Sequence, residues 1–191
     1  MPKDRIKSIC VYCGSRLGIS KEYAKNAEIL GEKIAHFNLK LVYGAGNIGL
    51  MGKLAQTCEI NGGNILGVIP YTLTKKEKAK KNINNFIITE DMHERKKVMY
   101  MNSDMIIALP GGIGTLEELM EIITWKQLGF HKKPIYLLNT LGFWDKLIGV
   151  FDNMRENGFV ESHILNYFRV FDSVDEIFSD LTKEGLIELK E

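Results

Sequence analysis

The sequence predicts a three-layer α/β sandwich built on a mostly parallel sheet of about seven strands. Short apolar runs rich in β-formers alternate with helical segments along the whole chain. These runs are apolar throughout, which is typical of strands buried on both faces. Alternating strands and helices imply right-handed crossovers and parallel strands. The expected fold is therefore Rossmann-like, with function in the loops that follow the carboxyl ends of the strands.

The expected elements follow one another in a regular order. Strands are expected at residues 7–14, 39–44, 64–70, 86–90, 104–110, 133–139 and 168–172. Helices are expected at residues 20–38, 48–62, 92–103, 115–129, 142–158 and 173–181. Ser20 and Ser173 have side chains suited to cap the helices that they precede. A polar connection, residues 71–85, leads to the fourth strand.

The bulk composition favours one globular domain over residues 1–191. The chain has 191 residues, of which 45% are hydrophobic and 26% charged, so two full domains would be cramped. A net charge of +1 gives no overall field that would favour nucleic acid or a membrane surface. No apolar run approaches the roughly 18 residues of a membrane span, and the first residues lack a signal core. The odd number of cysteines, three, fits a reducing, cytoplasmic location.

Cys10 and Cys13 form "CVYC", a spacing that also occurs in metal and redox sites. Here the pair lies in an apolar strand-like run, and residues three apart on a strand face opposite sides. No second cysteine pair completes a zinc site, and the four histidines are scattered. We therefore expect no metal.

The first glycine-rich loop, "GAGNIG" at residues 44–49, fits the G-x-G-x-x-G pattern of dinucleotide binding. A nicotinamide-dependent oxidoreductase is therefore one alternative. That interpretation requires an acid about 20 residues further on, at the end of the next strand, where this chain has Pro70 and Tyr71. The motif also follows the second strand rather than the first. The dinucleotide hypothesis is accordingly the weaker one.

The second glycine-rich loop, "PGGIGT", follows the fifth strand. Gly111, Gly112 and Gly114 lack β-carbons, so a ligand can approach the backbone amides closely. Unpaired amides at the start of a helix attract anions, and Thr115 adds a hydroxyl donor. No lysine follows the last glycine, so a monophosphate fits better than a magnesium triphosphate. A tight turn that lets strand and helix pack is the structural alternative.

Two acids, Glu117 and Glu118, are expected in the first turn of the helix that follows. Thr115 and Glu118 have the T-x-x-E spacing of a capping box, which gives Glu118 a purely structural alternative. Arg95 and Lys96, in "MHERKK", are expected where another helix begins at the same edge of the sheet. An arginine there can bind phosphate or a carboxylate through two parallel hydrogen bonds, or lie on a solvated helix face.

These motifs together resemble a known family. "PGGIGTLEE" fits the pattern P-G-G-x-G-T-x-x-E, and "MHERK", "CGS" and "GLMG" match at the appropriate distances. The chain is similar, from residue 8 to about residue 172, to the LONELY GUY (LOG) family of cytokinin riboside 5′-monophosphate phosphoribohydrolases. Members of this family have often been labelled lysine decarboxylases. One departure is Ala45, which stands where the family tends to have the middle of three successive glycines.

The resemblance implies a cytoplasmic enzyme that needs no cofactor and hydrolyses the N-glycosidic bond of an adenosine 5′-monophosphate-type nucleotide. The products would be the free base and ribose 5-phosphate. Arg95 and Glu118 are implied to be the catalytic pair, and the 5′-phosphate is implied to bind at Gly111, Gly112, Gly114 and Thr115. The rest of the nucleotide site is implied to comprise Lys96, Glu117, Glu77, Thr124, Gly14, Ser15, Gly46 and Asn47. Family members are homodimers with the site near the interface.

The chemistry of the residues agrees with this implication. Breaking an N-glycosidic bond builds positive charge on the ribose. A carboxylate can stabilise this charge, or it can act as a base that activates the attacking water molecule. The same scaffold could instead hold a nucleotide-like ligand, such as a molybdenum cofactor, without cleaving it. A pure anion binder, however, gains nothing from a carboxylate such as Glu118 near the phosphate. The helix expected at 115–129 has apolar residues on more than one face, which is compatible with a homodimer.

Overall fold

The computed structural model describes residues 5–74 and 86–188. Within these residues the chain forms a seven-stranded sheet in the order β4-β3-β2-β1-β5-β6-β7, and every neighbouring pair is parallel. The strands are β1 (Ser8–Tyr12), β2 (Lys40–Tyr43), β3 (Asn64–Pro70), β4 (Phe86–Thr89), β5 (Met105–Ala108), β6 (Ile135–Leu138) and β7 (Arg169–Phe171). The predicted α/β fold with a parallel sheet is confirmed.

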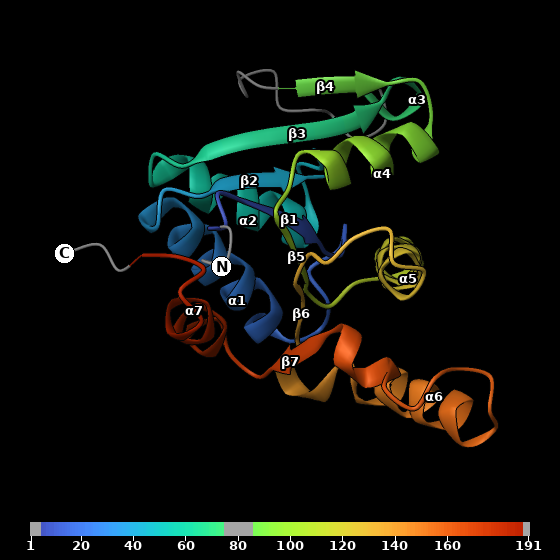
Figure 1. Cartoon of the computed structure of the whole chain (residues 1–191). Coiled ribbons are helices and arrows are strands. Elements are labelled where there is room, and N and C mark those ends of the chain that lie inside the picture. Colours follow the sequence, from blue (N-terminus) through green and yellow to red (C-terminus); the bar gives the residue numbers. More distant parts are fainter. Residues whose placement is uncertain (1–4, 75–85, 189–191) are drawn as a thin grey trace.

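Helices cover both faces of this sheet. The structure has α1 (Lys21–His36), α2 (Gly49–Ile60), α3 (Tyr71–Thr74), α4 (Met92–Met101), α5 (Ile113–Gln127), α6 (Asp145–Glu156) and α7 (Val174–Lys183), with short 3₁₀ turns η1 (Thr140–Gly142) and η2 (Ile164–Tyr167). Figure 1 shows α1, α2 and α7 on one side of the sheet and α4, α5 and α6 on the other. The result is the expected three-layer arrangement.

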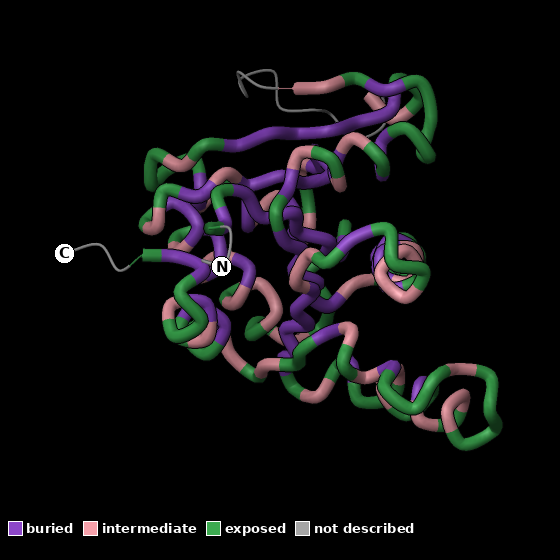
Figure 2. Tube along the Cα trace, viewed as in Figure 1, coloured by how far each residue is buried: buried purple, intermediate pink, exposed green. Residues whose placement is uncertain are grey.

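Two hydrophobic cores fill the spaces between the layers. One lies between the sheet and α1, α2 and α7, and the other between the sheet and α4, α5 and α6. Figure 2 shows the strands as mostly buried tubes, while the helices alternate between buried and exposed residues. Cys13 belongs to the first core and Cys10 to the second, so the two thiols lie on opposite sides of the sheet as predicted.

The two serines expected to cap helices do so. The Ser20 side chain accepts a hydrogen bond from the amide of Glu22 at the start of α1, and the Ser173 side chain accepts one from the amide of Glu176 at the start of α7. Each bond satisfies an amide that has no partner within its own helix.

The chain changes direction in the sheet between β1 and β5. Strands β1 to β4 follow one another outward, and β5 then returns to the other side of β1. This is the switch point at which parallel α/β sheets bind ligands. Backbone hydrogen bonds join the loops there: the amide of Gly14 donates to the carbonyl of Pro110 at 3.1 Å, and the amide of Leu50 donates to that of Gly14 at 3.0 Å. Loops from β1, β2 and β5 are thereby held together.

Over residues 5–74 and 86–188, no helix combines the length and apolar character needed to cross a bilayer. Nor do three or more metal-binding side chains gather at one place in the described part of the chain.

Candidate active site

The glycine-rich loop after β5 leads into α5 earlier than expected. The helix begins at Ile113 and Gly112 is its N-cap, without any side-chain cap. Thr115 is therefore already inside the helix, and Glu118 lies in the second turn rather than the first. The capping-box interpretation of Thr115 and Glu118 is wrong, because a capping box requires the threonine at the N-cap. The Glu118 carboxylate is left available for another partner.

The glycines of this loop have different neighbours. A β-carbon at Gly111 would collide with the side chain of Thr115, so this glycine allows the helix to start close to the strand. Gly112 and Gly114 have no atom within 4 Å of where a β-carbon would lie. Packing therefore does not explain these two glycines, and the open space beside them leaves room for a ligand to approach the amides at the start of α5.

Arg95 enters the site from the first turn of α4. This helix is capped by Asp91, whose side chain accepts from the amide of Glu94 at 2.8 Å. The Arg95 side chain is 9% exposed, its Nε donates to the carbonyl oxygen of Val68 at 3.2 Å, and its Nη2 donates to that of Gly44 at 3.3 Å. Two carbonyls at the ends of neighbouring strands thus fix the guanidinium group.

The remaining Nη1 atom of Arg95 faces Glu118. It lies 3.4 Å from Oε1 of Glu118, whose side chain is also 9% exposed. Burial raises the pKa of the Glu118 carboxyl group to about 7; Arg95 opposes that rise, and the negative charge of Glu117 adds to it. The structure therefore holds a carboxyl group that changes its charge near neutral pH, which suits acid–base chemistry.

Lys96 lies beside this pair and binds two other acids of α5. Its Nζ is 2.5 Å from Oε1 of Glu117 and 3.1 Å from Oε1 of Glu121, and its side chain is 6% exposed. Burial lowers the pKa of Lys96, but hydrogen bonds to the two carboxylates outweigh it, so the pKa is raised overall. Lys96 therefore remains charged and orients Glu117 at the edge of the site.

A cavity of about 310 Å³ lies in front of the Arg95–Glu118 pair. Such a volume is at the lower end of small-molecule sites. Seven of the residues predicted for the site line it: Ser15, Arg95, Gly112, Gly114, Thr115, Glu117 and Glu118. Its other lining residues are Val11, Cys13, Gly44, Met51, Leu73, Met92, Met99 and Ile113. The anion loop, the arginine and the carboxylate thus share one cavity.

Other predicted site residues do not line the cavity. Thr124 is exposed two turns further along α5, and its hydroxyl donates to the carbonyl of Met120 at 2.7 Å. Gly14, Gly46, Gly111 and Lys96 lie in or beside the surrounding elements without lining it, and Asn47 belongs to the loop after β2. Glu77 lies outside the described residues.

The structure explains two unusual residues in the loop after β2, Ala45 and Gly44. Ala45 has a φ of 61°, a left-handed conformation that favours glycine, and it is 1% exposed. The loop therefore keeps the backbone of a glycine despite the departure from the family pattern. A β-carbon at Gly44 would collide with Nη2 of Arg95. Gly44 consequently makes room for the arginine, which accounts for it without a dinucleotide.

Sequence reasoning missed several parts of the site. The carbonyls of Gly44 and Val68 that hold Arg95 carry no side-chain signal. Glu121, the second partner of Lys96, follows Glu117 by four residues and so lies on the same helix face, a spacing that could have revealed it. Met92 and Leu73 also line the cavity, but in the sequence they cannot be distinguished from apolar residues that pack in a core.

Comparison with known proteins identifies the broad class of proteins to which this chain is similar. A family model described as possible lysine decarboxylase matches residues 51–181. Two solved structures share the fold: the molybdenum cofactor carrier protein from Chlamydomonas reinhardtii, with a TM-score of 0.72 and 19% identity over 95% of this chain and 99% of that one, and the molybdenum cofactor binding protein from Rippkaea orientalis, with a TM-score of 0.69 and 22% identity over 94% and 97%. At such identities they show the Rossmann-like fold alone.

Curated relatives are more specific. The chain is 42% identical over 178 residues to a probable cytokinin riboside 5′-monophosphate phosphoribohydrolase, LOG4, of Oryza sativa subsp. japonica, covering 93% of this chain and 77% of that protein. It is 46% identical over 159 residues to the phosphoribohydrolase LOG5 of Arabidopsis thaliana, covering 83% and 70%. The chain belongs to the LOG family of cytokinin riboside 5′-monophosphate phosphoribohydrolases. These identities, roughly twice those of the molybdenum cofactor proteins, do not favour the non-catalytic alternative.

Proposed function

We propose that this protein hydrolyses the N-glycosidic bond of cytokinin-type adenosine 5′-monophosphates to free base and ribose 5-phosphate. The observation that carries the proposal is the buried Arg95–Glu118 pair, which faces the same cavity as an uncapped, glycine-rich helix start. The names of the curated relatives support the same reaction. The pKa of the Glu118 carboxyl group, about 7, also supports the proposal, because it allows this group to be ionised at neutral pH.

In the proposed complex, the 5′-phosphate lies against the amides that open α5. Gly112 and Gly114 leave open space there, and the hydroxyl of Thr115 adds a donor. The first amides of a helix lack intrahelical partners and the helix dipole favours a negative ligand, so a phosphate is stabilised at this position. The ribose then extends toward the second turn of the same helix, where Glu118 lies.

Glu118 supplies the chemistry at the ribose. As the bond between the base and C1′ lengthens, positive charge builds on the sugar ring, and the ionised carboxylate stabilises it. The same carboxylate accepts a proton from the water molecule that attacks C1′, while the bond from C1′ to the base breaks and the departing base nitrogen takes up a proton from solvent. Arg95, held by two carbonyls, keeps the carboxylate oriented and partly offsets the cost of burying its charge.

The substitution Glu118→Gln tests the proposal. It preserves the shape of the side chain but removes its charge and replaces one acceptor oxygen with an NH2 donor, so we expect hydrolysis to fall by at least about 10²-fold. Product chromatography after incubation with isopentenyladenosine monophosphate, AMP and adenosine measures the activity. Release of base from the two monophosphates but not from adenosine is the expected pattern for the wild type. A fully active, folded Glu118→Gln protein contradicts the assignment.

We also propose that the protein is a single-domain, cytoplasmic homodimer. The three cysteines are free and buried, as suits a reducing compartment. One side of α5 carries Leu116, which is exposed, and Met120, which is partly buried; exposed Leu128 follows the helix eight residues after Met120, and apolar residues spaced in this way suit packing against another helix. Ile113 begins this stripe and also lines the cavity, so a partner on the stripe would border the site.

A further inference from the structure

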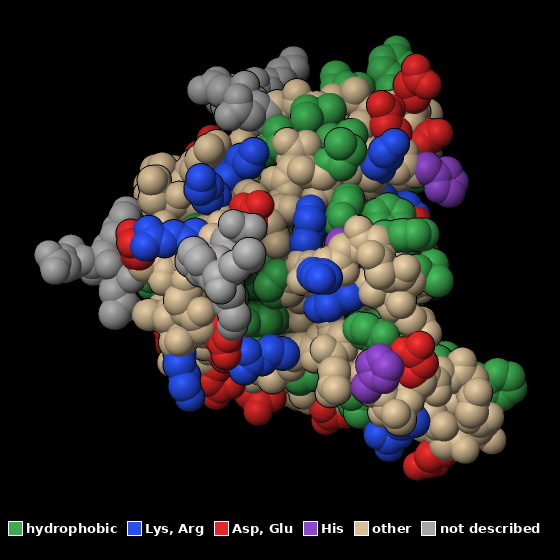
Figure 3. Space-filling view, viewed as in Figure 1, with side chains coloured by type: hydrophobic (Ala, Val, Ile, Leu, Met, Phe, Trp, Pro, Cys, Tyr) green, Lys and Arg blue, Asp and Glu red, His purple; other side chains and the backbone are tan. Residues whose placement is uncertain are grey.

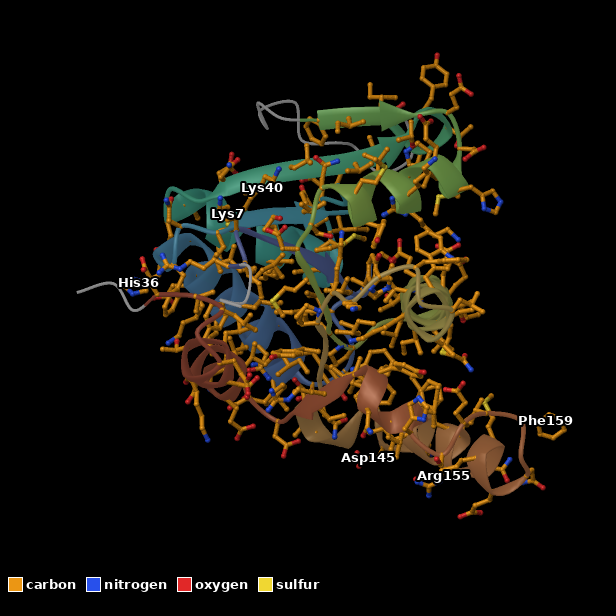
Figure 4. All side chains as sticks on the ribbon, in the orientation of Figure 1. Lys7, His36, Lys40, Asp145, Arg155 and Phe159 are labelled. Carbon is orange, nitrogen blue, oxygen red and sulfur yellow. The ribbon has the colours of Figure 1, made fainter. Side chains whose placement is uncertain are left out.

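The ion pairs between α4 and α5 join one lysine to two acids. Lys96 extends from α4 to α5, where its Nζ lies 2.5 Å from Oε1 of Glu117 and 3.1 Å from Oε1 of Glu121. The two acids are four residues apart, so they lie on the same face of α5 and one ammonium group can reach both. Figure 4 draws side chains in the space between these two helices. Neither the P-G-G-x-G-T-x-x-E motif nor the proposed reaction uses Glu121.

Burial makes the charge of Lys96 dependent on its acidic partners. Its side chain is only 6% exposed, and burial by itself lowers the pKa of the ammonium group. The hydrogen bonds and charges of Glu117 and Glu121 outweigh this effect and raise the pKa overall. A buried ammonium group that loses its carboxylates keeps the cost of desolvation without the compensating ion pairs. Lys96 is therefore stable in this position only while a carboxylate remains beside it.

The two acids differ in what else they can reach. The Glu117 side chain is 52% exposed and lines the cavity of the candidate active site. The Glu121 side chain is 25% exposed and does not line that cavity. A carboxylate accepts hydrogen bonds from hydroxyl groups such as those of a ribose. Of the two acids, Glu117 is therefore the one that a nucleotide in the cavity can reach.

We propose that Glu121 is a positioning residue, which holds the ammonium group of Lys96 so that Glu117 can leave Lys96 and accept hydrogen bonds from the ribose hydroxyls. The inference rests on the proposed function, because it requires a ribose phosphate in the cavity. Without Glu121, Glu117 is the only carboxylate within ion-pair distance of Lys96 among residues 5–74 and 86–188. Its movement to the ribose would then leave a buried charge unpaired. No bond is made or broken at Glu121.

A purely electrostatic role for Glu121 predicts the opposite result. Glu121 is an acid near a proposed phosphate site, so its neutralisation would by charge alone tighten the binding of a sugar phosphate. Figure 3 shows acidic and basic side chains both distributed over the face in view, and the net charge of the chain is +1. No strong overall field therefore masks this local change of charge. The sign of the change in affinity distinguishes the two roles.

Ribose 5-phosphate is the appropriate probe, because it carries the hydroxyls and the phosphate but has no glycosidic bond to the base. In calorimetric titrations, Glu121→Gln should raise the Kd of ribose 5-phosphate about tenfold, since the release of Glu117 then costs an unpaired ammonium group. Inorganic phosphate, which has no ribose hydroxyls for Glu117, should bind with unchanged or higher affinity. Equal weakening for both ligands would overturn the inference.

Glu28→Gln is the matched control. Glu28 of α1 also pairs with a lysine of a neighbouring helix, because its Oε1 lies 2.7 Å from Nζ of Lys53 in α2. The substitution removes the same charge and the same kind of ion pair, but neither residue lines the cavity. The Kd of ribose 5-phosphate should therefore remain at its wild-type value in Glu28→Gln.

Lys96→Met gives the second arm of the test. It removes the ammonium group and keeps an apolar stem, so Glu121 no longer has a cation to hold. In this background, Glu121→Gln should leave the Kd of ribose 5-phosphate unchanged or slightly lower, because the two substitutions act through one contact. Weakening of the same size with and without Lys96 would show that Glu121 acts by another route, and would refute the inference.

The outcomes separate this inference from the proposed function. Unchanged or tighter binding of ribose 5-phosphate in Glu121→Gln refutes the role of Glu121 even if the wild type hydrolyses AMP. Failure of the wild type to release base from AMP refutes the proposed hydrolysis, whereas the comparison of Kd values still decides the role of Glu121. A wild-type protein that does not bind ribose 5-phosphate saturably also overturns the inference.

Discussion

Glu118 is a carboxyl group whose charge depends on its neighbours as well as on burial. Because Glu117 contributes to its raised pKa, Glu117→Gln should lower that pKa and move the acidic limb of the kcat/KM profile below its wild-type position near pH 7. The loss of Glu117 also frees Lys96, whose charge acts in the same direction. The measurement is base release between pH 5 and 9, with the reaction otherwise retained. Abolished activity at every pH would instead show that Glu117 takes part in the chemistry.

Burial of Glu118 also affects stability. Its pKa in the folded state, about 7, exceeds the ordinary glutamate value of 4.5, so the folded state binds the proton more tightly than the unfolded state. The resulting stabilisation is complete below pH 4.5 and is lost as the pH rises to 7, a difference of about 3 kcal/mol. Relative to Glu118→Gln, the wild type should therefore become less stable over this window. Urea unfolding of both proteins at several pH values measures the difference, and a constant difference would contradict it.

At the scale of the elements, substitutions of the glycines in the two loops distinguish a packing role from a role in ligand binding. Gly44→Ala places a methyl group against the guanidinium of Arg95, so we expect a loss of kcat of about 10²-fold from misplacement of the proposed catalytic pair, Arg95 and Glu118. Gly112→Ala meets open space at a negative φ and should keep the melting temperature but raise KM, because it obstructs the phosphate. Gly149→Ala, in open space on α6, is the control with wild-type kinetics. Unchanged KM in Gly112→Ala would contradict phosphate binding at this loop.

The elements also show why sequence reasoning succeeded for strands and failed at a helix start. Strands such as β5 are apolar at every position because both faces are covered, and that pattern is visible in the sequence. The sequence predicts the start of α5 too late, because the N-cap residue is a glycine, which has no side chain to accept a hydrogen bond from a helix amide. Thr115 offered a conventional cap three residues later. The local pattern around Glu118 does not reveal its partner, because Arg95 comes from another element, α4.

At the scale of the whole molecule, the parallel sheet separates two chemically different edges. The carboxyl edge gathers the loops after β1, β2 and β5 around the Arg95–Glu118 pair, while Lys126, Lys132 and Lys133 line a groove at the amino edge. Strand order was not specified by the sequence, yet it decides which loops meet. The β1–β5 switch point brings Gly14 within hydrogen-bond distance of Pro110, almost a hundred residues away along the chain. The motifs could be recognised from the sequence, but their distances required the fold.

The exposed stripe on α5 predicts the assembly of the molecule. Leu128, 60% exposed, ends a row of apolar residues that begins with Ile113 at the cavity, and a helix face of this kind is stabilised by packing against a second copy. Light scattering after size exclusion should therefore give twice the chain mass of 21.7 kDa. Leu128→Glu should yield monomers, whereas Ile60→Glu, at a position that is 75% exposed on the opposite side of the sheet, should not. Since Ile113 belongs to both stripe and cavity, monomers should also show a raised KM for the nucleotide. A Leu128→Glu protein that remains dimeric with unchanged kinetics would place the interface elsewhere.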